Sequence, residues 1–124
     1  MSRQFILALP LLRGSSTAVS ESFYCGQLGF QLESENRPAP PATDPAFLAL
    51  IRDGVRLHLS SHAGDGVFGA VVAFAVRDVD ALHAEFGSRG VAIALPPIDQ
   101  TWGNREMYVR DPDGNALRFL QCDR

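Results

Sequence analysis

Residues 102–119 read WGNREMYVRDPDGNALRF, and this stretch decides the prediction of the fold. A short alternating run leads into the sequence Asp-Pro-Asp-Gly-Asn at residues 111–115, and a second alternating run follows it. Proline fixes φ at the first corner of a turn, whereas glycine and asparagine tolerate positive φ at its end. The stretch therefore predicts a β-hairpin.

The residues before this hairpin predict a strand, a helix and another strand. Gly69–Val76 is typical of a strand, and Asp78 is a suitable N-cap for the helix. The apolar face of that helix recurs at helical spacing and contains Val79, Leu82, His83 and Phe86. Gly90 ends the helix, Val91–Leu95 predicts a strand, and Pro96-Pro97 predicts a loop.

The first half of the chain predicts the same order of elements, beginning with a strand over Phe5–Leu12. A hydroxyl side chain among residues 15–17 is a candidate N-cap for a helix that extends to about Gln27. Its spacing places Val19 and Phe23 on the buried face.

Three further strands of this half are separated by two turn signals. The first runs from Leu28 to about Glu35, and the proline-rich residues 37–45 then predict a loop. Phe47–Ile51 and Val55–Ser60 predict two strands, and Asp53-Gly54 between them is a strong hairpin signal.

The two halves repeat at a nearly constant offset. Gly54 and Gly114 are 60 residues apart, Gly29 and Gly90 are 61 apart, and the segments 57–59 and 117–119 are again 60 apart. The prediction is a single α+β domain of residues 1–124, built from two βαβββ modules of about residues 1–62 and 63–124. Its curled mixed sheet would surround a cleft.

Composition narrows the class of partner. The 11 Lys and Arg residues and 14 Asp and Glu residues give a formal charge of -3, and the absence of a basic block argues against nucleic acid. The apolar run before Pro10 is too short to span a membrane. Cys25 and Cys122 lack metal-type spacing, and without an export signal they indicate reduced thiols in the cytoplasm.

Several motifs together resemble the vicinal-oxygen-chelate superfamily, which includes glyoxalase I, extradiol dioxygenases and bleomycin-resistance proteins. Ser22-Phe23-Tyr24 followed by Leu28-Gly29-Phe30 is similar to its first-helix signature. Residues 71–80, VVAFAVRDVD, resemble the start of its second module, and the closing hairpin resembles its last strand pair. The resemblance covers nearly the whole chain.

The resemblance also indicates where a metal would bind in metal-dependent members. The four ligand positions fall at Leu9, His58, Val71 and Arg118, of which only His58 is a metal-binding residue type. A catalytic divalent ion needs about three protein ligands, so we expect no metal and no cofactor. Arg118 would either present its guanidinium to an anionic or carbonyl group of a ligand or pair with Glu106.

A metal-free member resembles the bleomycin-resistance branch, and this likeness implies a homodimer. Leu7–Leu12 resembles the opening strand of those proteins, in which a proline, here Pro10, marks an arm exchanged between two chains. Residues 46–55 resemble the third strand of those proteins, whose aromatic residue, here Phe47, stacks on the drug, and Trp102-Gly103 resembles the loop that carries the second stacking aromatic. Alternatively, Phe47 belongs to the core and Trp102 to a dimer interface.

The predicted site combines these aromatic walls with polar side chains. Phe47 and Trp102 would form the walls, one from each chain of an exchanged dimer, and flat heteroaromatic ligands bind well between such faces. The polar contacts would come from His58, Arg118, Tyr108 and Glu106. Alternation puts Asn104, Glu106 and Tyr108 on one face of their strand, and we favour this face over that of Arg105, Met107 and Val109.

Two functions follow from this reading. The first is metal-independent binding and sequestration of a small molecule, an antibiotic of the bleomycin type, without catalysis. The second is a metal-independent isomerase or lyase that acts on an unknown small substrate, with Glu106 as a candidate general base. Turnover of substrates would distinguish the two.

Overall fold

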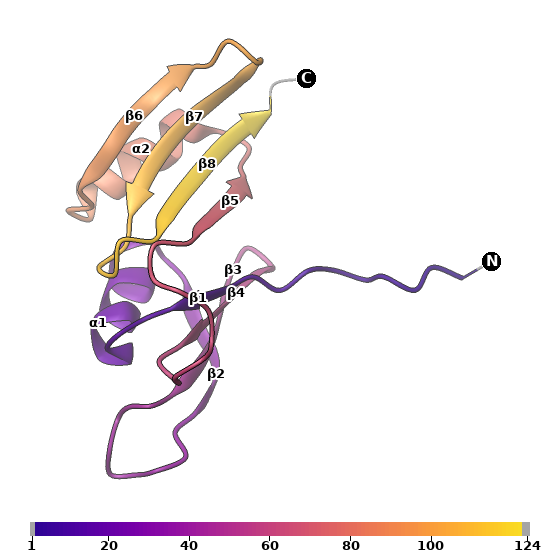
Figure 1. Ribbon diagram of the computed structural model, residues 1–124. Helices are drawn as coiled ribbons and strands as arrows, with labels where there is room; N and C mark the ends of the chain where they lie inside the picture. Colours follow the sequence, from indigo (N-terminus) through magenta and orange to yellow (C-terminus); the bar gives the residue numbers. More distant parts are fainter. Residues whose placement is uncertain (1, 123–124) are drawn as a thin grey trace.

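The structure is a computed structural model that describes residues 2–122, and its strands form two four-stranded sheets (Figure 1). Sheet A contains β1 (Leu11–Arg13), β2 (Gln31–Asn36), β3 (Phe47–Arg52) and β4 (Val55–Ser60). Sheet B contains β5 (Val71–Ala75), β6 (Ile93–Asp99), β7 (Asn104–Arg110) and β8 (Ala116–Cys122). The helical segments are α1 (Thr17–Glu21), the π-helix η1 (Ser22–Gln27) and α2 (Val79–Ser88).

The two sheets have the same topology, which confirms the α+β prediction with two βαβββ modules. Their strand orders are β1-β4-β3-β2 and β5-β8-β7-β6. In each sheet the first strand of the module pairs in parallel with the last, and the other neighbours are antiparallel.

Local turn and cap chemistry agrees with the sequence at three positions. Asp53 and Gly54 have φ of 51° and 78°, the pair of positive values that a two-residue hairpin turn requires. The Asp78 carboxylate accepts a hydrogen bond from the Ala81 N–H at 3.0 Å, so it caps α2 as predicted. The closing hairpin forms over β7 and β8.

The inner faces of both sheets pack with the helices into one core. Sheet A contributes Leu48, Leu50, Leu57 and Leu59, and sheet B contributes Met107, Val109, Leu117 and Phe119. A buried polar network joins the modules, because the Tyr24 hydroxyl donates to Asp111 at 2.7 Å and the Asn115 amide donates to the same carboxylate at 2.8 Å. The modules therefore have a fixed attachment at the β7–β8 turn.

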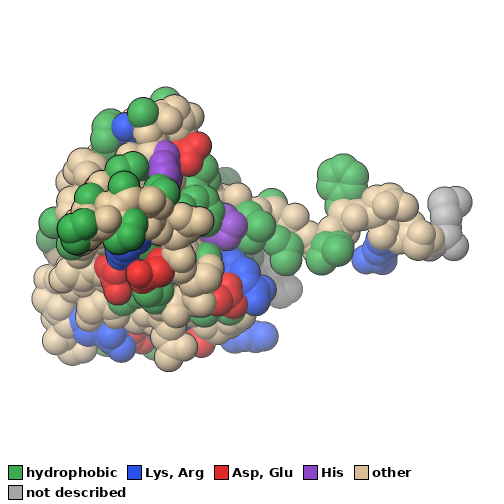
Figure 2. All heavy atoms as spheres, turned by 90° about the horizontal axis from the view of Figure 1, so that it is seen from below, with side chains coloured by type: hydrophobic (Ala, Val, Ile, Leu, Met, Phe, Trp, Pro, Cys, Tyr) green, Lys and Arg blue, Asp and Glu red, His purple; other side chains and the backbone are tan. Residues whose placement is uncertain are grey.

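The predicted strand over Phe5–Leu12 is wrong for most of its length. Only Leu11–Arg13 is paired, and the residues before it form an extended arm whose outer part stands clear of the body, with hydrophobic side chains along it (Figure 2). Phe5 is 97% exposed and Ile6 is 91% exposed. The change occurs at Pro10, whose carbonyl accepts from the His58 N–H at 2.9 Å but whose nitrogen has no hydrogen to donate.

Two smaller predictions also need correction. Pro96-Pro97 lies inside β6 and not in a loop. Because β6 is an edge strand whose register with β7 shifts around these residues, the missing proline N–H groups interrupt no regular run of hydrogen bonds between the strands. Of the two residues predicted for the buried face of the first helix, Phe23 is buried, whereas Val19 is 51% exposed; Tyr24 joins Phe23 in the core from the π-helix that begins at Ser22. No helix among residues 2–122 is long and apolar enough to cross a membrane.

Candidate ligand-binding site

The register of sheet B decides which face of β7 is turned away from the core. Met107 is paired with Phe119, and both are buried. Tyr108 is paired with Arg118, and these side chains therefore project from the opposite face of the sheet. The favoured set of Asn104, Glu106 and Tyr108 thus lies on this second face, which we call the open face of sheet B.

Three donors on this open face converge on one carboxylate. Glu106 is only 3% exposed, and it accepts hydrogen bonds from Trp102 Nε1 at 2.8 Å, Asn104 Nδ2 at 3.2 Å and the Tyr108 hydroxyl at 2.7 Å. Trp102 itself is 63% exposed. A large aromatic ring at the surface is therefore fixed from below by a buried acceptor.

The loop that carries Trp102 is shaped by its own backbone. The Gly103 N–H donates to the Gln100 carbonyl at 3.1 Å, and the Gln100 N–H donates to the Asn104 carbonyl at 2.8 Å. Gly103 has φ of 103°, a conformation that L side chains rarely adopt. Glycine at this position lets the indole N–H turn back onto Glu106.

The hydrogen bonds also set the charge of Glu106. Burial raises the pKa of its carboxyl, but the donors from Tyr108, Trp102 and Asn104 outweigh burial, and the pKa is lowered overall. The same contact with Glu106 raises the pKa of Tyr108. A carboxylate with lowered pKa and occupied oxygens is a poor general base, which weighs against the catalytic role considered for Glu106.

The alternative pairing of Arg118 with Glu106 does not form. Within residues 2–122 the Arg118 guanidinium forms no hydrogen bond or ion pair. The Cζ atom of Arg118 lies 5.1 Å from the centre of the Tyr108 ring, and the residue is exposed. Arg118 is close enough to lower the pKa of Glu106 by its charge. Its donor groups remain turned toward the open face.

Phe47 and His58 form a second cluster on sheet A. Their rings lie 5.0 Å apart in an edge-on arrangement, and both side chains are half-buried. Phe47 pairs with Ser60 and projects from the face opposite Leu48, so it does not belong to the core. In the described chain no hydrogen bond, ion pair or ring contact joins this cluster to Trp102 or Arg118. The six predicted residues thus form two groups, one on each sheet.

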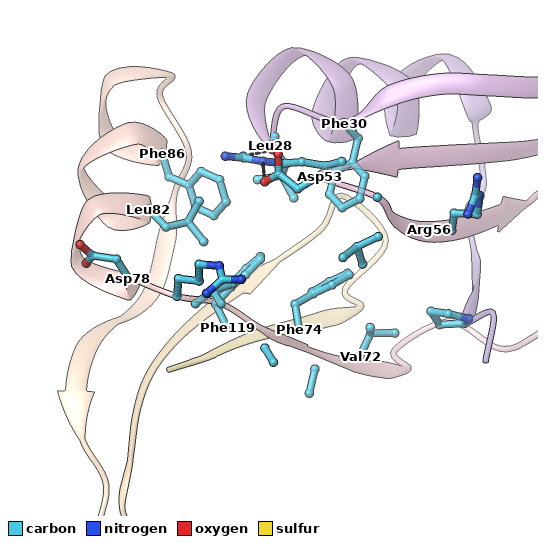
Figure 3. A pocket seen from close by; sticks show the side chains of 18 of the residues that line it. Leu28, Phe30, Asp53, Arg56, Val72, Phe74, Asp78, Leu82, Phe86 and Phe119 are labelled. Atoms are coloured by element: carbon cyan, nitrogen blue, oxygen red, sulfur yellow. Dashed lines mark hydrogen bonds and ion pairs between the residues drawn. The ribbon is translucent and has the colours of Figure 1, made fainter. Parts of the chain in front are cut away.

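A large cavity of about 1120 Å³ lies elsewhere, between the two modules (Figure 3). Figure 3 shows Phe30, Phe74, Phe86 and Phe119 directed toward this space from both modules. Its other lining includes β5, α2, the turn between β3 and β4, and the arm residues 7–10. None of the six predicted site residues lines it.

The residues at the metal-ligand positions do not fit a catalytic metal ion. Leu9 and Val71 offer no donor atom, and Arg118 is cationic. No group of three or more His, Cys, Asp or Glu side chains suited to a metal occurs within residues 2–122. Freedom from metal stays a prediction that elemental analysis can test.

Asn104 is the contact that residue types alone did not single out. Alternation places it on the correct face, but its role as a donor to Glu106 depends on the loop geometry. The Tyr24–Asp111 bond between the modules gives no signal in the sequence, since its two residues are 87 positions apart.

The comparisons with known proteins agree with this architecture. The family profile described as "Glyoxalase superfamily protein" matches residues 2–124. The chain belongs to this superfamily. A bleomycin resistance protein of Geobacillus stearothermophilus is 26% identical to this chain, and the match covers 92% of this chain and 95% of the relative.

Two solved structures extend the likeness. The bleomycin-binding protein of Streptomyces verticillus, in complex with copper(II)-bleomycin, is 27% identical with a TM-score of 0.72, covering 98% of this chain and 100% of that one. The bleomycin resistance determinant encoded on transposon Tn5 has a TM-score of 0.78 at 22% identity, covering 97% and 100%. The second match supports the fold alone.

Proposed function

We propose that this protein binds a planar aromatic small molecule and sequesters it without turnover, and that antibiotics of the bleomycin type are the first ligands to test. Binding alone protects a target, so a shaped aromatic site is sufficient. Relatives described as bleomycin resistance proteins and a structure in complex with copper(II)-bleomycin support this class of ligand.

The observation that carries the proposal is the fixed, exposed Trp102. A tryptophan at the surface costs free energy unless something covers it, and here its polar edge is held by Glu106 while its ring stays 63% exposed. Such a ring is already ordered for stacking, which reduces the entropy lost when a ligand binds.

The functional unit in this proposal is a homodimer with exchanged arms. The arm exposes Phe5, Ile6 and Leu7 at 97%, 91% and 59%, and a chain in water gains by burying them. β5 pairs only with β8 among the described residues, so its other edge has free backbone groups beside the intermodule cavity. The arm of a second chain would supply both the apolar side chains and the backbone partners.

The dimer also explains the two separate clusters. In this arrangement Phe47 and His58 of one chain would face Trp102, Glu106, Tyr108 and Arg118 of its partner. Each dimer would then contain two equivalent sites, as twofold symmetry requires.

Titration with metal-free bleomycin tests the ligand, because Trp102 is the one tryptophan in the sequence and its emission reports on this loop. We expect quenching or a shift of emission, and Trp102→Ala should weaken binding measured by calorimetry by about 1–3 kcal/mol. Val19→Ala, which changes an exposed side chain of α1, is the control. Affinity that survives both Trp102→Ala and Phe47→Ala would place the ligand elsewhere.

Mixing two inactive variants tests the assembly. If each site takes its two aromatic residues from different chains, Phe47→Ala and Trp102→Ala proteins refolded together should recover about a quarter of the sites, since random pairing makes half of the dimers mixed and each mixed dimer has one intact site. Sites built within one chain would recover none. Sedimentation showing a monomer at micromolar concentration would refute the dimer directly.

A further inference from the structure

We propose that the ligand of this site carries a carboxylate or another anionic oxygen on its aromatic ring system, and that Arg118 is the residue that selects it. This inference rests on the proposed function, because it names the chemistry of the ligand for the same open face. The proposed function concerns stacking on Trp102, whereas this inference concerns the charge that the site prefers on the stacked ligand.

Glu106, on the open face of sheet B, and Glu33, beside Arg56 on the face of sheet A that carries Phe47, both have partners among the described residues. On sheet B, both oxygens of Glu106 are occupied by Trp102, Asn104 and Tyr108. On sheet A, Glu33 is bound in a two-point ion pair to Arg56, at 2.9 and 3.0 Å. A cationic ligand would have to displace these donors before it gained a partner.

Arg56 is neutralised by Glu33, but three other arginines of the same faces have no carboxylate partner among the described residues. Arg118 is exposed over the Tyr108 ring, and no carboxylate contacts it within residues 2–122. Arg110, which has the same parity on β7, is also exposed and forms no ion pair with a described residue. On sheet A, Arg13 donates to the His62 carbonyl at 2.9 Å and lies over the Phe68 ring. The strands of these faces therefore present arginines without an ion pair, whereas their carboxylates Glu106 and Glu33 are engaged.

The arrangement of Arg118 is suited to selection and not only to attraction. Its guanidinium rests on the Tyr108 ring, and the Tyr108 hydroxyl is in turn held by Glu106, the residue that also fixes Trp102. The stacking ring and the cation are thus connected through one carboxylate. A guanidinium held in this way presents a planar pair of donors that matches a carboxylate on a ligand stacked beside it.

Three matched acridines test the inference, because they differ in charge at one position. We would measure the binding of acridine-9-carboxylate, acridine-9-carboxamide and 9-(aminomethyl)acridine by calorimetry at neutral pH. The affinity for the carboxylate should be at least about tenfold higher than that for the aminomethyl compound, because one charge-assisted hydrogen bond changes an affinity by about this factor. Arg118→Met should abolish this preference, and Arg118→Lys should restore part of it.

Two controls separate the possible failures. Arg89→Met removes one positive charge from the C-terminal end of α2 and should leave the preference unchanged. Equal binding of the three acridines, or a preference that persists in Arg118→Met, would overturn the selection by Arg118. If metal-free bleomycin still binds in that case, the proposed function stands; if neither bleomycin nor any acridine binds, both proposals are refuted.

Discussion

Replacing Glu106 by leucine should release Trp102 while leaving the sheet intact. The change removes the acceptor of the 2.8 Å indole bond and of the bonds from Asn104 and Tyr108, and leucine has a similar volume in a position that is 3% exposed. Since Trp102 is 63% exposed, water can satisfy its N–H, and the main loss is order. A released ring must be immobilised again when a ligand binds, at about 0.5–1.5 kcal/mol.

The expected result is a roughly two- to tenfold weaker affinity for metal-free bleomycin, together with lower fluorescence anisotropy of Trp102 in the free protein. Glu106→Gln keeps one acceptor oxygen and should lie between the two proteins in both measurements. Glu35→Gln, an exposed change on sheet A, is the control and should change neither. Anisotropy equal to that of the original protein in Glu106→Leu would show that the buried carboxylate does not hold the ring.

Three further outcomes follow from the structure. Purified protein should carry no stoichiometric zinc, nickel, iron or manganese, and chelators should leave its melting temperature unchanged; about one metal ion per chain after dialysis would contradict the donor argument at Leu9, Val71 and Arg118. Tyr24→Phe should lower the free energy of unfolding by about 1.5–3 kcal/mol in urea, because it removes a buried 2.7 Å bond to a carboxylate, and a loss below 0.5 kcal/mol would refute that estimate. Burial raises the pKa of Asp44, but hydrogen bonds from Ser61 and Thr17 lower it overall. The contribution of Asp44 to the free energy of unfolding is therefore present above the pKa of the unfolded state and is lost as the pH falls through the pKa of the folded state. Asp44→Asn should flatten this part of the acid unfolding curve.

Local chemistry explains why much of the fold could be predicted. Asp53-Gly54 needs no distant partner to favour its turn, and Asp78 caps α2 with an atom three residues away from its donor. The prediction failed where a neighbour decides the outcome. The Phe5–Leu12 stretch has the pattern of a strand, yet within one chain only Leu11–Arg13 has a partner.

The site shows the same division between local and distant causes. Alternation separates the two faces of β7, but the choice between them depends on Met107 packing with Phe119 in the core. The role of Arg118 depends on whether Glu106 has a free oxygen, and that depends on the loop that bends Trp102 back onto it. Residue types could place Arg118 near Glu106, but only the geometry shows that Glu106 is already occupied.

The engagement of Glu106 by three donors depends on this sequence and not on the scaffold that the chain shares with its relatives. Relatives described as bleomycin resistance proteins support antibiotic binding on this scaffold, but the charge at a binding site depends on each sequence. Here the acidic group of the open face holds Trp102, and the exposed cation beside it is Arg118. We therefore expect the charge of the preferred ligand to depend on Arg118 and not on the family to which the chain belongs.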